Sequence, residues 1–516
     1  MMDLIFFNAN VITLDPQIKT AQMVAVKDGR ILAVAHGTEI KDLKQRHTQL
    51  IDCHGKTLLP GFCDAHLHLQ SSASNIVNLD LSPQANVFSI SDIQIKIREF
   101  SKTLAPGSWI RASGYNEFYL AEKRHPTSIE LDKAAPNHPV KLTHRSWHAH
   151  VLNSLALKQA GISRYTPEPS GGLIERNTTT GEPNGILFEM NDFLSKHIPT
   201  LDESELTRGI KIINQKMLSY GITSIHDASF NNGIEQWNTL CSWKEKNIFL
   251  PRATMALGVE GFGNLKANKY SCPVGKNQIR LSTIKIILDE TTGQLYPPQK
   301  KLNRLVFNIH QAGLQVAIHA IEHTAVESAC NAIEHALKKI PNPNHRHRIE
   351  HCSVCSPSLV KRLAELKIIV VTQPSFIHYN GDRYLKTVAK EDIPHLYPIG
   401  TLQKSGVMVV GSSDSPIVEP NPITGIYSAI SRMAKTGKAV SAKESIDNLS
   451  ALEMFTGNAA KAFFDEDMKG SITPGKLADL VLLSGDPTKL SSEEIKDITV
   501  VMTIIDGKIV WESSKH

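Results

Sequence analysis

Residues 60–69 read Pro-Gly-Phe-Cys-Asp-Ala-His-Leu-His-Leu, a short apolar run that ends in two histidines. Side chains on a β-strand repeat every two residues, so Asp64, His66 and His68 share one face. Two imidazoles at that spacing can bind one metal ion, and a carboxylate behind them can fix a histidine tautomer. The alternative is a pair of ordinary histidines near a strand end, because the chain has 22 histidines.

Three polar residues further along the chain also stand where apolar runs end. His319 and His351 close short apolar runs, and Asp414 follows the apolar run 407–411. Burying a polar side chain without a partner is costly, so this repeated placement needs a physical reason. One metal site shared by all the residues placed in this way supplies that reason: His66, His68, His319, His351 and Asp414.

The middle of the chain alternates short apolar runs with helical patterns such as Thr324–Lys339. Strands separated by helices predict a parallel (β/α)8 barrel, whose catalytic groups gather at the carboxyl ends of the strands. The gap at 69–139 is too long for one helix and its loops, so we expect an insertion there that covers the barrel mouth. The candidate strands are Gly61–His68, Val140–Thr143, Ile222–His226, Thr283–Leu288, Gln315–His319, Arg348–His351, Ile368–Thr372 and Val407–Gly411.

The two ends of the chain resemble each other in style. Each has two β-prone runs joined by Asp-Gly, at Asp28-Gly29 and at Asp506-Gly507, which is a hairpin signal. We therefore predict an α/β fold in which residues 1–58 and 465–516 form one small composite β domain. Residues 59–464 form the barrel between them.

Composition limits the function classes. The chain has 516 residues and a formal charge of +5, which is too weak to argue for nucleic acid or an anionic membrane surface. We expect no targeting segment and no membrane span. The seven cysteines are scattered except Cys352 and Cys355, a C-x-x-C that lacks a second pair. A reduced, cytoplasmic compartment is the expectation. The expected partner is a small-molecule substrate, and a homodimer stays open.

Lys285 lies inside the apolar run 282–288, where an ammonium group is costly to bury. One interpretation is an ion pair with Asp289, which lies on the same strand face. The other is that the amine loses its proton and reacts with carbon dioxide, giving a carbamate that can bridge two metal ions. We favour the carbamate.

The motifs taken together resemble the amidohydrolase superfamily, and within it the branch of N-substituted formamide deformylases. The resemblance covers nearly the whole chain. It rests on residues 60–68, 148–157, 171–176, 181–185, 221–227, 412–416 and 475–480. It departs from the usual pattern at Glu322-His323, at Asp289-Glu290 and at Asn116, so the substrate of a relative does not transfer.

The resemblance implies a distorted (β/α)8 barrel and roles for individual residues. His66, His68 and Asp414 would bind the buried metal, and Asp414 would also be the general base. His319 and His351 would bind a second ion or help hold a single one, and Lys285, if carboxylated, would bridge. The ion is expected to be zinc, as one or two ions.

The expected reaction is hydrolysis of a non-peptide C–N bond in a small amide, formamide, carbamate or cyclic amide. A divalent ion lowers the pKa of a bound water from 15.7 to about 7, and Asp414 takes the proton. His148 and His226 are candidates for contacts with the substrate oxyanion, or are structural histidines. The alternatives are ester or lactone hydrolysis, deamination or decarboxylation at the same site, and a catalytically silent homologue used for binding.

Overall fold

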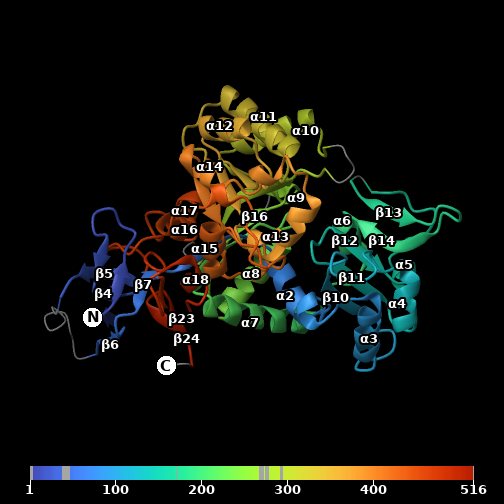
Figure 1. The fold of residues 1–516 in the computed structure, drawn as a ribbon, viewed down its shortest axis with the longest axis horizontal. Coiled ribbons are helices and arrows are strands. Elements are labelled where there is room, and N and C mark those ends of the chain that lie inside the picture. The colour runs from blue at the N-terminus through green and yellow to red at the C-terminus, as the bar shows by residue number, and fades with distance from the viewer. Residues whose placement is uncertain are drawn as a thin grey trace. The chain divides into compact units, whose positions relative to one another are not determined.

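The computed structural model (Figure 1) describes residues 4–37, 47–169, 171–265, 272, 278–290 and 295–514. Eight of its strands form one parallel sheet. The strand order is β21-β20-β19-β18-β17-β16-β15-β8, and the two end strands contact each other, so the sheet is a nearly closed barrel. The strands are β8 (Phe62–Leu67), β15 (Ile222–Asp227), β16 (Arg252–Leu257), β17 (Ile279–Ile287), β18 (Gln315–Ala320), β19 (Arg348–His351), β20 (Ile369–Thr372) and β21 (Val409–Gly411).

Helices connect the barrel strands, as parallel pairing requires. In α11 (His323–Lys339) the buried residues Val326, Ala329, Ile333 and Ala336 lie three or four positions apart, so one face packs inward. The other helices of this part are α8 (Ile234–Glu245), α9 (Val259–Asn264), α10 (Gln299–Gln311), α12 (Pro357–Glu365), α13 (Ser375–Thr387), α14 (Ile399–Lys404), α15 (Pro422–Ser431), α16 (Asn448–Met454) and α17 (Gly457–Ala462).

Both ends of the chain build a small β domain of two sheets. One sheet has the order β5-β4-β1-β6 and the other β24-β23-β22-β7-β2-β3, so C-terminal strands pair directly with N-terminal ones. Its strands are β1 (Leu4–Phe7), β2 (Asn10–Ile12), β3 (Thr20–Ala21), β4 (Met23–Lys27), β5 (Arg30–Ala35), β6 (Gln49–Asp52), β7 (Thr57–Pro60), β22 (Leu480–Leu483), β23 (Val500–Ile505) and β24 (Lys508–Glu512); the short helix α18 (Ser492–Ile495) precedes β23.

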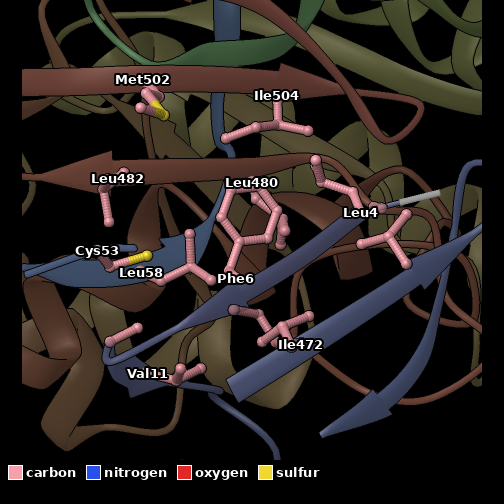
Figure 2. Close-up of a cluster of buried hydrophobic side chains, with 14 of the residues drawn as sticks. Leu4, Phe6, Val11, Cys53, Leu58, Ile472, Leu480, Leu482, Met502 and Ile504 are labelled. Atoms are coloured by element: carbon pink, nitrogen blue, oxygen red, sulfur yellow. The ribbon is translucent and has the colours of Figure 1, made fainter. Parts of the chain in front are cut away.

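The core of this β domain is shared between the two ends (Figure 2). Phe6 and Leu58 lie in one buried cluster with Leu480 and Ile504. Both predicted hairpins are present, and their Asp-Gly turns have positive φ at both residues, as a type I′ turn requires. The prediction of a (β/α)8 barrel with a composite β domain from both termini is confirmed.

A second compact unit comprises residues 70–212 and 289–296. It contains a six-stranded sheet of order β13-β14-β12-β11-β10-β9, in which β9, β10 and β11 are parallel. Its strands are β9 (Leu79–Asp80), β10 (Ile110–Tyr115), β11 (Val140–His144), β12 (Ala149–Leu152), β13 (Leu173–Arg176) and β14 (Pro183–Phe188). Its helices include α3 (Ile90–Ser101), α4 (Ser128–Ala134), α5 (Ser154–Gln159) and α6 (Asn191–His197), while α2 (Leu69–Val77) and α7 (Glu203–Ser219) begin and end the insertion.

One predicted barrel strand is wrong. Val140–Thr143 does form a strand, but it pairs with β10 and β12 of the inserted sheet and not with any barrel strand. The barrel position belongs to β16, which the sequence pattern did not reveal. The insertion that we expected to end at residue 139 therefore continues to about residue 212. That it covers the barrel mouth stays a prediction.

The cysteines differ from expectation at one pair. Cys241 of α8 and Cys272 form a disulfide between Cα atoms 5.7 Å apart, a separation that disulfides require but that sequence spacing does not signal. The other five cysteines, Cys352 and Cys355 among them, are buried and free. Among the described residues, no helix combines the length and apolarity needed to cross a membrane.

Candidate metal centre

The backbone brings the end of β21 beside the end of β8. Asp414 N donates to His66 O at 2.8 Å, and His68 N donates to Ser415 O at 2.8 Å. These alternating bonds extend the ladder of the barrel past its last strand and fix the position of Asp414. Gly61 directly precedes β8. A Cβ atom there would lie 2.3 Å from the Thr223 side chain, so the close approach of the chain to β15 at this point needs glycine.

Asp64 holds this junction in place from inside the barrel. Its Oδ1 accepts from Ser413 N at 3.0 Å, and Ser413 Oγ donates to its other oxygen. Burial raises the pKa of Asp64 to about 6, although both bonds from Ser413 favour its ionised form. Asp64 therefore positions the segment that carries Asp414. Among the described residues, its hydrogen bonds are to Ser413 and to the backbone N of His66 at 3.3 Å, whereas the sequence pattern suggested a bond to an imidazole nitrogen.

Three side chains predicted as metal ligands converge at this junction. His68 Nε2 lies 3.1 Å and His66 Nε2 lies 3.5 Å from Asp414 Oδ1, and candidate ligand atoms of all three residues lie within 4.8 Å of one another. His66 is fully buried, Asp414 is nearly so, and His68 is partly exposed. Burial alone would raise the pKa of Asp414, but a hydrogen bond from His68 and positive charge on His66 and His351 outweigh burial and lower that pKa, so the carboxylate is ionised when a cation faces it.

The Nδ1 atom of each of three histidines has a partner that fixes its tautomer. His68 Nδ1 is 3.1 Å from Ser229 Oγ, and that hydroxyl donates to the Asp227 carboxylate at 2.6 Å, so the imidazole must be the donor to Ser229. His351 Nδ1 is 2.9 Å from Gln373 Oε1, which can only accept.

His66 Nδ1 contacts a carboxylate oxygen of Glu350. In all three rings the proton is therefore on Nδ1, and Nε2 keeps a lone pair.

This arrangement calls for a positive charge. Two nitrogen lone pairs and a carboxylate oxygen face one another at the ends of His66, His68 and Asp414, and without a cation among them they would repel. A divalent metal ion satisfies all three at once, and imidazole and carboxylate are ligands that zinc accepts. The donor set therefore fits the metal that the sequence predicted.

The other two histidines predicted as ligands, His319 and His351, lie next to this cluster. The rings of His319 and His351 are 4.4 Å apart, and those of His66 and His351 are 4.9 Å apart. His351 and Asp414 both have positive φ, at 74° and 58°. Non-glycine residues adopt this conformation at a cost that is common in active sites, where strain holds a side chain in place.

Lys285 projects from β17 into the same group. It is 1% exposed, and its Nζ lies 3.3 Å from His66 Nε2. Burial lowers the pKa of this amine to about 8, although Glu350 and Asp414 partly oppose the shift. An ammonium donor at His66 Nε2 uses the lone pair that a metal ion would need, so the ammonium and the metal exclude each other there.

The two histidines predicted to contact substrate have different surroundings. His226 is completely buried, with Nδ1 2.9 Å from Thr254 Oγ1 and Nε2 3.2 Å from Thr283 Oγ1, which fits the structural alternative. His148 lies in the inserted unit, where its Nδ1 is 2.7 Å from Glu189 Oε1. Its side chain is 49% exposed.

Three residues that contact Nδ1 of the predicted histidine ligands were not predicted from the sequence. Glu350 stands directly before His351, and Gln373 directly after β20, so their places at strand ends were a usable signal. Ser229 lies beyond the end of β15, and nothing in its local sequence points to His68.

The model of the Amidohydrolase family matches residues 49–511. The chain belongs to the amidohydrolase family. The chain is 28% identical to an N-substituted formamide deformylase from Arthrobacter pascens over 99% of each chain, which confirms the predicted resemblance. It is 27% identical to the protein LONG AFTER FAR-RED 3 from Arabidopsis thaliana, over 99% of this chain and 91% of that one.

A solved structure shows the same fold. The crystal structure of a metal-dependent hydrolase from Pyrococcus horikoshii OT3 has a TM-score of 0.75 and 21% identity, over 95% of this amidohydrolase and 99% of that chain. Family membership confirms the prediction that the chain is an enzyme, a hydrolase of carbon–nitrogen bonds.

Proposed function

We propose that this amidohydrolase hydrolyses a non-peptide C–N bond in a small amide, formamide, carbamate or cyclic amide, with Asp414 as the general base. The observation that carries the proposal is the convergence of His66 Nε2 and His68 Nε2 on the ionised Asp414 carboxylate. The similarity to an N-substituted formamide deformylase supports the amide or formamide class.

The roles of the chain's own groups follow from their positions. A bound divalent ion supplies Lewis acidity and makes water acidic enough to be deprotonated at neutral pH. Asp414 accepts the proton of the attacking water and returns it to the leaving nitrogen, which must be protonated before the amine departs. Asp64, through Ser413, keeps the carboxylate oriented during both transfers.

We propose zinc as the ion, with His66, His68 and Asp414 holding the first position. His319 and His351 would complete that position or hold a second ion. Lys285 would bridge two ions as a carbamate, because its buried amine faces the lone pair of His66 and would otherwise compete with the metal. The amine attacks carbon dioxide, a C–N bond forms, and one proton is released.

His148 remains the candidate for a contact with the substrate oxyanion, because about half of its side chain is exposed, at 49%. We assign His226 a structural role for the reason given above. We further propose a cytoplasmic enzyme that acts on a small molecule, and a homodimer stays open. The buried free thiols support a reducing compartment, whereas the Cys241–Cys272 disulfide weighs against it. Thiol titration of freshly prepared protein tests whether the cysteines are reduced. Sedimentation tests whether the protein is a dimer.

The same site can also support ester or lactone hydrolysis, deamination or decarboxylation, and a silent binding homologue is the alternative from another class. The deciding experiment incubates zinc-loaded and chelator-treated protein with N-formyl amines, N-acyl amines, carbamates, lactones and amino-substituted heterocycles. Release of an amine by the zinc-loaded protein alone supports the proposal. Activity only on lactones or heterocycles, or equal activity without metal, contradicts it.

A further inference from the structure

We propose that Glu350 is a positioning residue that aims His66 at the metal. The inference rests on the proposed metal site. Glu350 and His66 are each 0% exposed, and a Glu350 carboxylate oxygen contacts His66 Nδ1. A carboxylate accepts only, so His66 must carry its proton on Nδ1 and direct its Nε2 lone pair toward Asp414. In the other tautomer, Nε2 would carry a proton and could not bind a metal.

Arg348 holds Glu350 in this position. Its Nε donates to the other Glu350 oxygen at 2.6 Å, and its Nη2 donates to Ala65 O at 3.4 Å. Arg348 therefore contacts both the carboxylate and the backbone directly before His66. The guanidinium lies over the Phe463 ring, 5.1 Å from its centroid, and is fully buried.

Two strands are linked by this chain of contacts. Arg348 and Glu350 belong to β19, whereas His66 belongs to β8, and strands β20 and β21 lie between them along the sheet. Their side chains therefore meet across the barrel interior, beneath the metal position. Strand β19 also carries His351 at its end. Because Glu350 of this strand contacts the His66 ring, one strand orients two predicted ligands, His351 and His66.

The Nδ1 contacts of His68 and His351 differ from that of His66, and the nearest carboxylate oxygen to His351 Nδ1 is Asp414 Oδ2 at 4.0 Å. His68 meets a hydroxyl and His351 meets an amide oxygen. A carboxylate is the strongest of these acceptors, and it also makes the imidazole a better metal ligand. Burying that charge is costly without a cationic partner, which explains why Arg348 is present. We therefore expect His66 to depend on its partner more than His68 and His351 depend on theirs.

The test measures zinc affinity of the full chain by competition with a chromophoric chelator, for wild type, Glu350→Gln and Glu444→Gln. Glu444 is the matched control, because it is 6% exposed and accepts from Thr401 N and Oγ1 at 2.8 and 2.7 Å, on α14. Glu350→Gln should raise the zinc dissociation constant by about 10- to 100-fold. Glu444→Gln should leave the zinc dissociation constant within about twofold of the wild-type value. Both variants lose stability, because each replaces a buried carboxylate by an amide.

A second variant covers the case in which Glu350→Gln does not fold. Arg348→Met with Glu350→Met removes both charges together, which proteins often tolerate, and still removes the acceptor from His66. In addition, NMR of metal-free protein labelled with ¹⁵N-histidine should show an Nδ1–H signal for His66, assigned by its loss in His66→Gln. That signal should disappear in the double variant.

The outcomes separate the two proposals. If wild type binds zinc and the folded Glu350 variants bind it equally well, the role of Glu350 is overturned while the metal site stands. Finding His66 of wild type in the Nε2–H tautomer would also overturn the role of Glu350 while the metal site stands. If wild type binds no zinc, the proposed function fails first.

Discussion

The Nε2 atom of His68 lies 3.1 Å from Oδ1 of Asp414, and the proton of His68 is committed to Ser229 on the opposite side of the ring. The pair cannot be a simple neutral hydrogen bond, because neither facing atom has a hydrogen to give. A proton or a metal ion must lie between them. The predictions about the site all follow from this relationship.

Replacing Asp414, the proposed general base, should remove turnover without removing the metal ion. Asp414→Asn keeps an oxygen ligand but cannot accept a proton, so metal should stay bound while turnover falls by about 10²- to 10⁴-fold. Metal analysis and kcat of the same preparation check this. Asp447→Asn, which alters only the N-cap of α16, is the control and should keep wild-type turnover. An Asp414→Asn enzyme with more than about a tenth of wild-type kcat contradicts the role as base.

Lys285 can be compared with a second buried lysine. Lys285→Ala should lower metal content to about one ion or fewer per chain, with partial rescue by a short carboxylic acid that replaces the carbamate oxygens. Lys244 is 6% exposed and donates to the carbonyls of Leu250 and Pro251, so Lys244→Ala should lower stability and leave the metal content unchanged. Elemental analysis of both variants decides. Unchanged stoichiometry in Lys285→Ala refutes the carbamate.

Stability should fall as the pH is lowered, through histidines held neutral. His310 Nε2 donates to Ile340 O, so its Nδ1 must accept from His347 Nε2 at 2.8 Å. His347 Nδ1 accepts from Val316 N, and His345 Nδ1 accepts from His347 N. Burial lowers the pKa of both His345 and His347. The nitrogens of His345 and His347 that lack a hydrogen are therefore occupied, and neither ring can take a proton without losing a bond.

The sign of the pH effect follows from these lowered pKa values. The unfolded chain binds a proton at each histidine below about pH 6.5, whereas the folded chain does not, so folding stability is full above that pH and is lost below it. Each such histidine contributes up to about 1.4 kcal/mol per pH unit. His347→Gln should reduce this slope in chemical denaturation between pH 7 and pH 5, and His54→Gln, at an exposed position, should not. Parallel curves for wild type and His347→Gln would refute the explanation.

One buried ion pair should stabilise the attachment of the β domain to the barrel. Arg252 of β16 donates to Asp479 through Nε and Nη2 at 2.5 and 2.9 Å, and to Asp506 at 3.0 Å. The Asp479 side chain is 2% exposed and that of Asp506 is 47% exposed. Asp479→Asn should therefore destabilise by about 3–5 kcal/mol, and Asp506→Asn by less than about 1 kcal/mol. Denaturation midpoints compare the two, and equal losses would contradict the burial argument.

The predictable part of the fold has a clear physical basis. Barrel strands such as Ile369–Thr372 are buried on both faces and rich in β-branched residues, so they are visible as apolar runs. The predicted metal ligands are visible in the sequence because they end such runs. The Asp-Gly turns are equally local, because their backbone requires residues that tolerate positive φ.

The errors occurred where the deciding contacts are distant in sequence. Strand β16 reads Arg-Ala-Thr-Met-Ala-Leu, which favours a helix by composition and opens with a charge that is neutralised by Asp479 and Asp506, far along the chain. Val140–Thr143 has a good strand pattern, but a pattern does not say which sheet a strand joins. The support of His66 by Glu350 is also a long-range contact, between residues 284 positions apart.

The central claim is that His66, His68 and Asp414 hold a catalytic metal ion. The most direct measurement is the metal content of the purified full chain beside that of the double variant His66→Ala with His68→Ala, both equilibrated with limiting zinc and then desalted. We expect at least one zinc ion per wild-type chain, and loss of that ion in the folded double variant. Equal zinc content in the two proteins, or none in wild type, would contradict it.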